Sequence, residues 1–230
     1  MSDQIIALSE ILLEKVKLKK NFKSEIEELK LIDLSSLQKA LLNDNQKKVF
    51  WINLYNAFIQ ISGSELETNK KQYFTKKRIG FKDFILSFDD IEHGILRKGR
   101  YKYSLGYFNT VLMKASIRQL KVQKLDYRIH FALNCGAVSC PPVLFYSLNK
   151  IEDQLQLATV AFLEQSTRVD EVYKKVEVTK LFLFYLKDFG GFSGIKNLLI
   201  DKGFISDNNY KIEFDQYDWT LKLNNFASYE

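Results

Sequence analysis

Apolar residues recur with helical spacing through the first quarter of this chain. Residues 4–17 and 24–42 both have the pattern of amphipathic helices, with Ile5, Leu8 and Leu12 on one stripe of the first. We treat residues 1–42 as a helical extension that packs on a domain spanning residues 43–230.

A third predicted helix starts after Asn43, which can cap it, and runs to about residue 66. Its apolar positions go almost all the way round, which indicates a helix at the centre of the core. Three amides interrupt it, because Asn53, Asn56 and Gln60 fall at i, i+3 and i+7 and so share one strip. Buried amides need hydrogen-bond partners. They therefore either hold neighbouring loops or face a polar site.

The segment SFDDIEHGILR, residues 87–97, predicts a short helix. Ser87 followed three residues later by Asp90 is a capping-box pattern. Glu92 then lies beside the apolar face of this helix and His93 lies near its rim. A carboxylate on a buried face is ion-paired, hydrogen-bonded or shifted in pKa, so Glu92 is a functional candidate. The alternative is a structural salt bridge to a nearby base such as Arg97.

Alternation of apolar and polar residues over 127–134 predicts a strand that places His130 and Asn134 on one face. Pro141 is a residue type favoured in the first turn of a helix. If a helical turn starts there, Cys140 lies at its N-terminus, where backbone amides and the helix dipole activate a thiol. We therefore expect Cys140, rather than the preceding cysteine, to be the reactive one.

The remaining pattern predicts mixed structure. We expect helices over residues 150–166, 180–189 and 193–202, a hairpin over residues 169–180, a late strand near residues 210–214, and Trp219 packed in the core. The fold class is thus α+β: a predominantly helical single domain with a small, mainly antiparallel sheet.

Composition narrows the class of protein. With 230 residues, 46% of them hydrophobic, and only two prolines, the chain can bury a core and offers no linker. No window has the roughly 20 apolar residues of a membrane span, and no secretory leader is recognisable. We expect a cytoplasmic protein whose two cysteines are free thiols.

The net charge of +6 resides in one segment. Residues 70–102 hold ten bases against four acids. Such a segment, interleaved with aromatic residues, meets nucleic acid, anionic lipid or an acidic substrate, or it is only a solvated surface. No nucleic-acid-binding motif supports the first option, so we do not expect a nucleic-acid partner.

Candidate chemistry concentrates in residues 130–140, which hold one of two histidines and both cysteines. In the main hypothesis the chain is a cysteine-dependent hydrolase or acyl transferase, with Cys140 as nucleophile, His130 or His93 as base, and Glu92 orienting the imidazole. We expect five side chains around the site to support it: Asn53, Asn56, Asn134, Cys135 and Ser139. We expect two arginines, Arg97 and Arg128, to bind an anionic or peptide-like substrate.

Three other interpretations stay open. A zinc site could recruit His93, His130, Cys135 and Cys140, although the usual ligand spacings are missing; otherwise we expect no cofactor. A Cys135–Cys140 disulfide could have a redox role, although its spacing is not Cys-x-x-Cys. Finally, the chain could be a non-enzymatic interaction module with a basic surface segment.

Three stretches resemble the signature segments of a known family: FWINLYNAF (50–58), SFDDIEHGILR (87–97) and RIHFALNCGAVSCPP (128–142). They are similar to the family catalogued as domain of unknown function 547. The later segments KLFLFYLKDFGG (180–191) and YDWTLKLN (217–224) look similar to its C-terminal part. The resemblance implies one joint polar site but no settled reaction. By residue types alone, the site is also similar to the papain and transglutaminase arrangement, which is an analogy.

Overall fold

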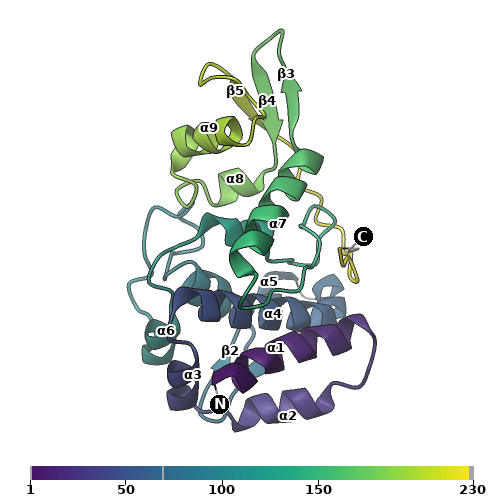
Figure 1. Cartoon of the computed structure of the whole chain (residues 1–230), viewed down its shortest axis with the longest axis vertical. Coiled ribbons are helices and arrows are strands. Elements are labelled where there is room, and N and C mark those ends of the chain that lie inside the picture. Colours follow the sequence, from purple (N-terminus) through teal and green to yellow (C-terminus); the bar gives the residue numbers. More distant parts are fainter. Residues whose placement is uncertain (1, 69, 228–230) are drawn as a thin grey trace.

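Helices dominate the lower part of the molecule and a helix-backed sheet forms its upper part (Figure 1). The computed structural model describes residues 2–68 and 70–227. The α-helices are α1 Ser2–Lys17, α2 Lys23–Leu31, α3 Leu34–Ala40, α4 Asp44–Ser62, α5 Lys70–Tyr73, α6 Ala115–Leu120, α7 Ile151–Ser166, α8 Leu181–Phe184 and α9 Gly191–Asp201. Two 3₁₀ helices, η1 Gly63–Glu67 and η3 Tyr127–Phe131, and a π-helix, η2 Asp90–Leu96, complete the helical elements that the structure describes.

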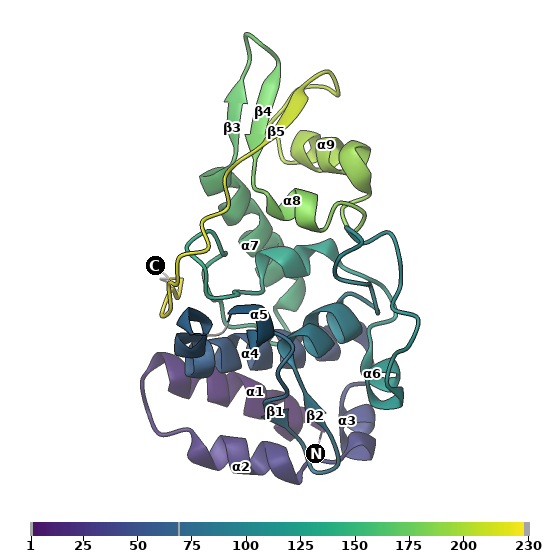
Figure 2. The ribbon, with the colours of Figure 1, turned by 180° about the vertical axis from the view of Figure 1, so that it is seen from behind.

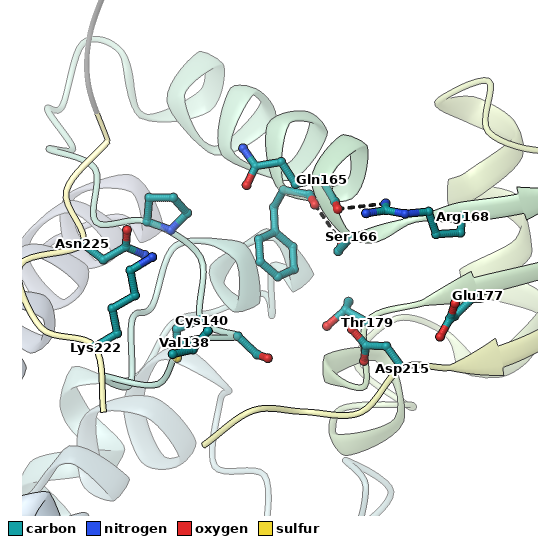
Figure 3. A pocket seen from close by; sticks show the side chains of 13 residues that line it. Val138, Cys140, Gln165, Ser166, Arg168, Glu177, Thr179, Asp215, Lys222 and Asn225 are labelled. Atoms are coloured by element: carbon teal, nitrogen blue, oxygen red, sulfur yellow. Dashed lines mark hydrogen bonds between the residues drawn. The ribbon is translucent and has the colours of Figure 1, made fainter. Parts of the chain in front are cut away.

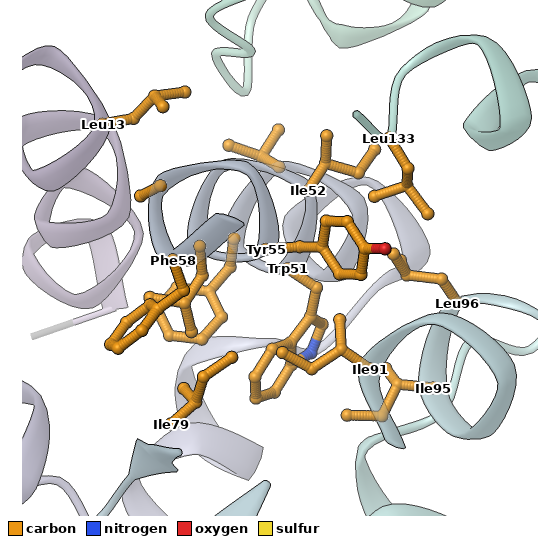
Figure 4. Packing of buried hydrophobic residues seen from close by; sticks show 14 of the residues in the cluster. Leu13, Trp51, Ile52, Tyr55, Phe58, Ile79, Ile91, Ile95, Leu96 and Leu133 are labelled. Atoms are coloured by element: carbon orange, nitrogen blue, oxygen red, sulfur yellow. The ribbon is translucent and has the colours of Figure 1, made fainter. Parts of the chain in front are cut away.

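Helix α4 lies at the centre of the lower core, as its all-round apolar pattern predicts. It carries Trp51, Ile52 and Tyr55, which are fully buried and pack with α1 and η2 (Figure 4). Asn43 caps it, because its side chain accepts from the backbone of Gln46 and Gln46 bonds back. The prediction of this helix and of its cap is confirmed.

The expected single helix over residues 24–42 is two helices, α2 and α3. Asp33 separates them in an extended conformation, and its carboxylate accepts a hydrogen bond from Ser36 N at 2.8 Å. This is the geometry of an N-cap, and it starts a new helix. With α1, these helices contribute to the same buried cluster as α4.

The described strands form two small sheets. β1 Ile79–Gly80 pairs antiparallel with β2 Ile85–Leu86, and β3 Arg168–Asp170 pairs antiparallel with β4 Lys175–Val178. β5 Lys211–Phe214 adds to β4 in parallel (Figure 2). A second apolar cluster fills the space between this three-stranded sheet and α7, α8 and α9. The α+β class, with a small and mainly antiparallel sheet, is confirmed.

After β5 the chain runs back down the molecule and joins the two parts (Figure 1). Val138 N donates to the carbonyl of Thr220 at 2.9 Å, and Lys222 N donates to the carbonyl of Gly136 at 2.7 Å. Isolated bridges pair Ala137 with Leu221 and Val143 with Phe226. The C-terminal segment is thereby fixed against the cysteine-bearing loop.

Two local expectations around that loop are wrong. Residues 127–131 form a 3₁₀ helix and not a strand: Asp126 caps it, and Ile129, His130 and Phe131 are all buried, so no exposed face alternates with a buried one. No helix begins at Pro141, so the expected helix N-terminus at Cys140 is absent. The expectation that Trp219 packs in the core is wrong as well, because its side chain is 53% exposed and packs on Tyr217.

Candidate functional site

Cys135 and Cys140 form a disulfide, with their Cα atoms 6.2 Å apart. The expectation of free thiols is therefore wrong in the part of the chain that the structure describes. A turn brings the sulfurs together: Gly136 adopts φ +88° and donates to Asn134 Oδ1, and Cys140 N bonds to the Ala137 carbonyl. A side chain at Gly136 would strain this left-handed conformation.

The two sulfurs have unequal surroundings. Cys140 is 5% exposed, and its Sγ accepts from Cys135 N at 3.1 Å. The Tyr217 hydroxyl lies 3.2 Å from the same Sγ and 3.6 Å from Cys135 Sγ. Disulfide sulfurs carry no hydrogen, so Tyr217 is the donor. Burial, and then the charge of Glu92, raise the pKa of Tyr217 and keep its proton in place. Cys135 is only partly buried.

Each cysteine borders a different pocket. Cys140 lines a cavity of about 420 Å³ together with Arg168, Asp215 and Lys222, which lies between the C-terminal segment and the ends of β4 and β5 (Figure 3). Cys135 lines a cavity of about 600 Å³ whose walls are mainly apolar: Leu66, Phe74, Trp219 and Leu221. The disulfide thus separates a polar pocket from an apolar one.

The two histidines belong to a buried ionic cluster beside this region. Arg97 Nε donates to Asp188 Oδ2 at 2.5 Å, and both side chains are fully buried. His130 Nε2 lies 2.9 Å from the same Oδ2, and its ring stacks on Tyr185 at 3.8 Å between centroids. Arg97 Nη1 lies 2.8 Å from His93 Nδ1. One carboxylate and one guanidinium therefore hold both imidazoles.

Glu92 joins the cluster through two phenols. Tyr185 donates to its Oε1 at 2.7 Å and Tyr55 to its Oε2 at 3.3 Å. The capping box of Ser87 and Asp90 is formed as predicted. The helix that follows is a π-helix, with Arg97 N bonded to the carbonyl of Glu92 at 2.7 Å.

This wide turn decides how the side chains are placed. In an α-helix, residues five apart lie about 140° apart around the axis. In the π-helix, the i→i+5 hydrogen bond widens the turn, so that residues five apart come to lie on the same side of the helix. Glu92 and Arg97 therefore reach one cluster from one short helix.

The protonation states follow from the hydrogen bonds. Guanidinium only donates, so His93 Nδ1 accepts and its proton is on Nε2. Burial lowers the pKa of His93 and of His130, and the nearby carboxylates only partly offset this effect. Burial alone would raise the pKa of Asp188, but His130 and Arg97 lower it overall. For Glu92, burial is likewise outweighed by His93, Tyr185 and Arg97, and its pKa is lowered.

The amides predicted to support the site act as crosslinks to backbone. Asn53 bonds to both the N–H and the carbonyl of Tyr146. Asn56 donates to the Ala132 carbonyl at 2.9 Å and accepts from Asn134 N at 2.9 Å. Asn134 Nδ2 in turn donates to the Pro141 carbonyl at 2.7 Å. These bonds shape the loop that carries the disulfide.

Ser139 has a related role. Its Oγ accepts from Asp218 N at 2.8 Å, and its N–H donates to the Asp218 carbonyl at 3.2 Å. These two bonds fix the residue next to Tyr217, and so help to hold the phenol against the sulfurs.

The two arginines predicted to bind substrate are engaged inside the protein. Arg97 pairs with Asp188 as described, and Arg128 pairs with Asp126 at 2.7 Å and with Glu152 at 2.6 Å. Burial alone would raise the pKa of Asp126, but the hydrogen bonds and charges of Arg128 and Lys48 lower it to about 2.

The basic segment is also largely paired. Ion pairs join Lys76 and Arg78 to Glu65, Lys77 to Asp90, and Lys102 to Asp89. The side chains of Lys70 and Lys71 lie outside the described ones. Asp89 and Asp90 are already among the four acids of the segment, so in the described ion pairs the acids that offset its surplus of positive charge are Glu65 and Asp188.

The four proposed zinc ligands do not come together as one donor set. Both cysteines are in the disulfide, His93 bonds to Arg97, and His130 bonds to Asp188. Within the described residues, no group of three or more histidine, cysteine or acidic side chains is arranged to hold a metal ion. Neither imidazole hydrogen-bonds to a sulfur there.

Sequence reasoning missed three residues of this site: Asp188, Tyr185 and Tyr217. Asp188 is the only acid in the apolar stretch 181–192, and that isolation was a usable signal. Tyr185 lies three residues before it, so one short turn presents both. Nothing in the pattern distinguishes Tyr217 from other tyrosines, because it is placed by backbone pairing with residues 136–143.

None of the helices within residues 2–68 and 70–227 has the length and hydropathy of a membrane span. No curated protein and no solved structure matches the chain. A family model described as "Protein of unknown function, DUF547" matches residues 39–163, more than half of the sequence. That range holds the buried amides of α4, the π-helix and the disulfide loop. The chain therefore belongs to the DUF547 family of proteins of unknown function.

Proposed function

We propose that the chain catalyses thiol–disulfide exchange through Cys135 and Cys140. The observation that carries this proposal is the asymmetry of the pair: Cys135 is partly exposed beside an open pocket, whereas Cys140 is buried with two hydrogen-bond donors on its sulfur. Exchange requires one sulfur that a thiolate can reach and another that leaves as a stabilised thiolate.

The reaction begins when a substrate thiolate attacks Cys135 Sγ. A bond forms between the substrate sulfur and Cys135, the Cys135–Cys140 bond breaks, and its electron pair leaves on Cys140 Sγ. Cys135 N–H and the Tyr217 hydroxyl donate to this thiolate at the positions they already occupy. A second substrate thiolate then attacks the substrate sulfur of the mixed disulfide and frees Cys135. The substrate leaves as a disulfide, and the protein has gained two electrons.

The cysteine-dependent hydrolase or acyl transferase is the second candidate. It needs Cys140 as a free thiolate, which the same two donors would stabilise once the disulfide is reduced. The polar pocket beside Cys140, with Arg168, Asp215 and Lys222, suits an anionic or peptide-like substrate. Against this candidate, His130 and His93 already have Asp188 and Arg97 as partners. Because it needs the free Cys140 thiolate, this activity would appear only after reduction of the disulfide.

The test measures turnover of a dithiol peptide by the oxidised protein, with a disulfide reagent present to reoxidise it. Tyr217→Phe removes the hydroxyl that supports the Cys140 thiolate. A hydrogen bond to a charged group is worth about 1.5–3 kcal/mol, so exchange is expected to slow about tenfold or more. Tyr173→Phe is the matched control, because Tyr173 is exposed on the β3–β4 turn and should leave the rate unchanged.

Both single variants Cys135→Ser and Cys140→Ser should abolish turnover. A wild-type rate no faster than that of the uncatalysed mixture would refute exchange. Hydrolysis of a chromogenic thioester by reduced protein, lost in Cys140→Ser and kept in Cys135→Ser, would favour the hydrolase or transferase instead.

A further inference from the structure

One loop exposes an unusual concentration of large apolar side chains. Among the described residues, seven of the exposed large apolar side chains fall within residues 101–112: Tyr101, Tyr103, Leu105, Tyr107, Phe108, Val111 and Leu112. Val111 and Leu112 are 94% and 91% exposed, and Tyr103 and Phe108 exceed 70%. Single exposed apolar residues are common, but a cluster of this kind marks an interaction surface. We call residues 100–114 the aromatic loop.

The aromatic loop is held in place by its base. Arg100 pairs with Asn109 in an antiparallel bridge, and Thr110 N donates to the Gly99 carbonyl at 2.8 Å. The turn that follows α8 also holds the aromatic loop, because Lys187 N donates to the Leu105 carbonyl at 2.9 Å. It runs along the edge of the molecule between α8 and α6 (Figure 2). Its apolar side chains therefore project from an anchored base.

Along the sequence, the charged residues in and around the loop all have one sign. No aspartate or glutamate occurs between Glu92 and Asp126, a stretch that contains eight lysines and arginines. Lys98, just before the loop, and Lys114, its last residue, are exposed. The ammonium of Lys187 lies 5.7 Å from the Tyr107 ring centroid. Lys102 is paired with Asp89 and contributes less.

We propose that the aromatic loop docks the protein onto an anionic lipid surface. Phe108, Val111 and Leu112 would enter the boundary between headgroups and acyl chains, where apolar side chains gain burial. Tyrosines suit the same interface because each has an apolar ring and a polar tip. Lysines on the flanks would meet anionic headgroups, and each is worth about a fivefold gain in affinity. The docking residues are separate from the disulfide, so lipid binding is independent of the exchange reaction.

Charge complementarity favours lipid over a second copy of this chain. Two copies joined through this loop would place like charges from Lys98 and Lys114 against each other, which opposes association. An anionic bilayer gains from the same charges.

The test is co-sedimentation of the full chain with vesicles of phosphatidylcholine alone and of phosphatidylcholine with about one-third phosphatidylglycerol. We expect binding to the anionic vesicles, weakened by salt. The triple variant Phe108→Ser, Val111→Ser and Leu112→Ser should abolish it. The control is Val172→Ser with Tyr173→Ser, which removes apolar residues of similar exposure from the β3–β4 turn and should bind as the wild type does.

A second pair of changes, Lys98→Gln and Lys114→Gln, should weaken binding about fivefold for each charge removed. The altered side chains lie on the surface, so thermal unfolding should confirm that all variants fold. Absence of binding to anionic vesicles, equal binding to neutral ones, or undiminished binding by the triple variant would each overturn the proposal. The proposal would also be overturned if the wild-type protein bound no vesicles but self-associated, and the triple variant lost this self-association.

Discussion

Replacing Asp188 by asparagine tests whether the buried ionic cluster is held together as the structure indicates. The change keeps the shape of the side chain but removes the charge that faces Arg97 at 2.5 Å and His130 at 2.9 Å. The side chain of Arg97 is completely buried. Its guanidinium would remain charged without the carboxylate to which it bonds, and the charge of Glu92, which does not hydrogen-bond to it, would be left to balance it.

The expected cost is large because a buried charge loses its partner. Breaking a buried ion pair from one side destabilises by about 3–5 kcal/mol. For a chain of this size, that corresponds to a fall in Tm of about 6–20 °C. The double variant Arg97→Met with Asp188→Asn removes both charges, so its loss of stability should be clearly smaller than the sum of the two single losses.

Urea unfolding followed by circular dichroism measures these free energies. Asp201→Asn, an exposed position at the end of α9, is the matched control and should change stability by less than about 0.5 kcal/mol. If Asp188→Asn unfolds within about 1 kcal/mol of the wild type, or if the two single losses simply add, the buried pair does not exist as described.

Three further predictions concern the same region. Reduction of the disulfide should lower the free energy of unfolding by only about 2 kcal/mol, because it closes a short loop, and urea titrations with and without dithiothreitol check this; a loss of cooperative unfolding would contradict it. The free energy of unfolding should fall as the pH drops below about 6.5, because the pKa of His130 is lowered in the folded protein and the unfolded chain therefore binds the proton first. Measured at several pH values, the free energy of unfolding should change less in His130→Gln. Gly106→Ala should cost more than Gly203→Ala: both have positive φ, but a methyl group at Gly106 collides with the Asp188 carboxylate, whereas none of the described atoms is within 4 Å at Gly203. Equal Tm values for these two variants would refute that contact.

Local patterns predicted the elements whose stability is local. Asn43 and Gln46 form the expected capping interaction, and Ser87 with Asp90 does so again. The hairpin of β3 and β4 and the all-round burial of α4 also follow from residue spacing. Each depends on neighbours within a few positions along the chain.

The site itself could be predicted only in part. Glu92, His93 and His130 were found from residue type and spacing. Asp188, the partner of His130, lies far away in the sequence, and tertiary packing alone brings it close. The stretch 127–134 alternates like a strand, yet residues 127–131 form a 3₁₀ helix that Asp126 caps and in which Ile129, His130 and Phe131 are all buried. The Cys135–Cys140 disulfide was only an open alternative to free thiols, because it depends on the turn at Gly136.

In the proposed exchange, an incoming thiol reacts with Cys135 Sγ and displaces Cys140 Sγ. Oxidised wild-type protein can be mixed briefly with glutathione, quenched in acid, alkylated and mapped by peptide mass spectrometry. We expect glutathione on Cys135 and the alkyl group on Cys140. Glutathione on Cys140, or two alkylated cysteines in protein never exposed to a thiol, would contradict it.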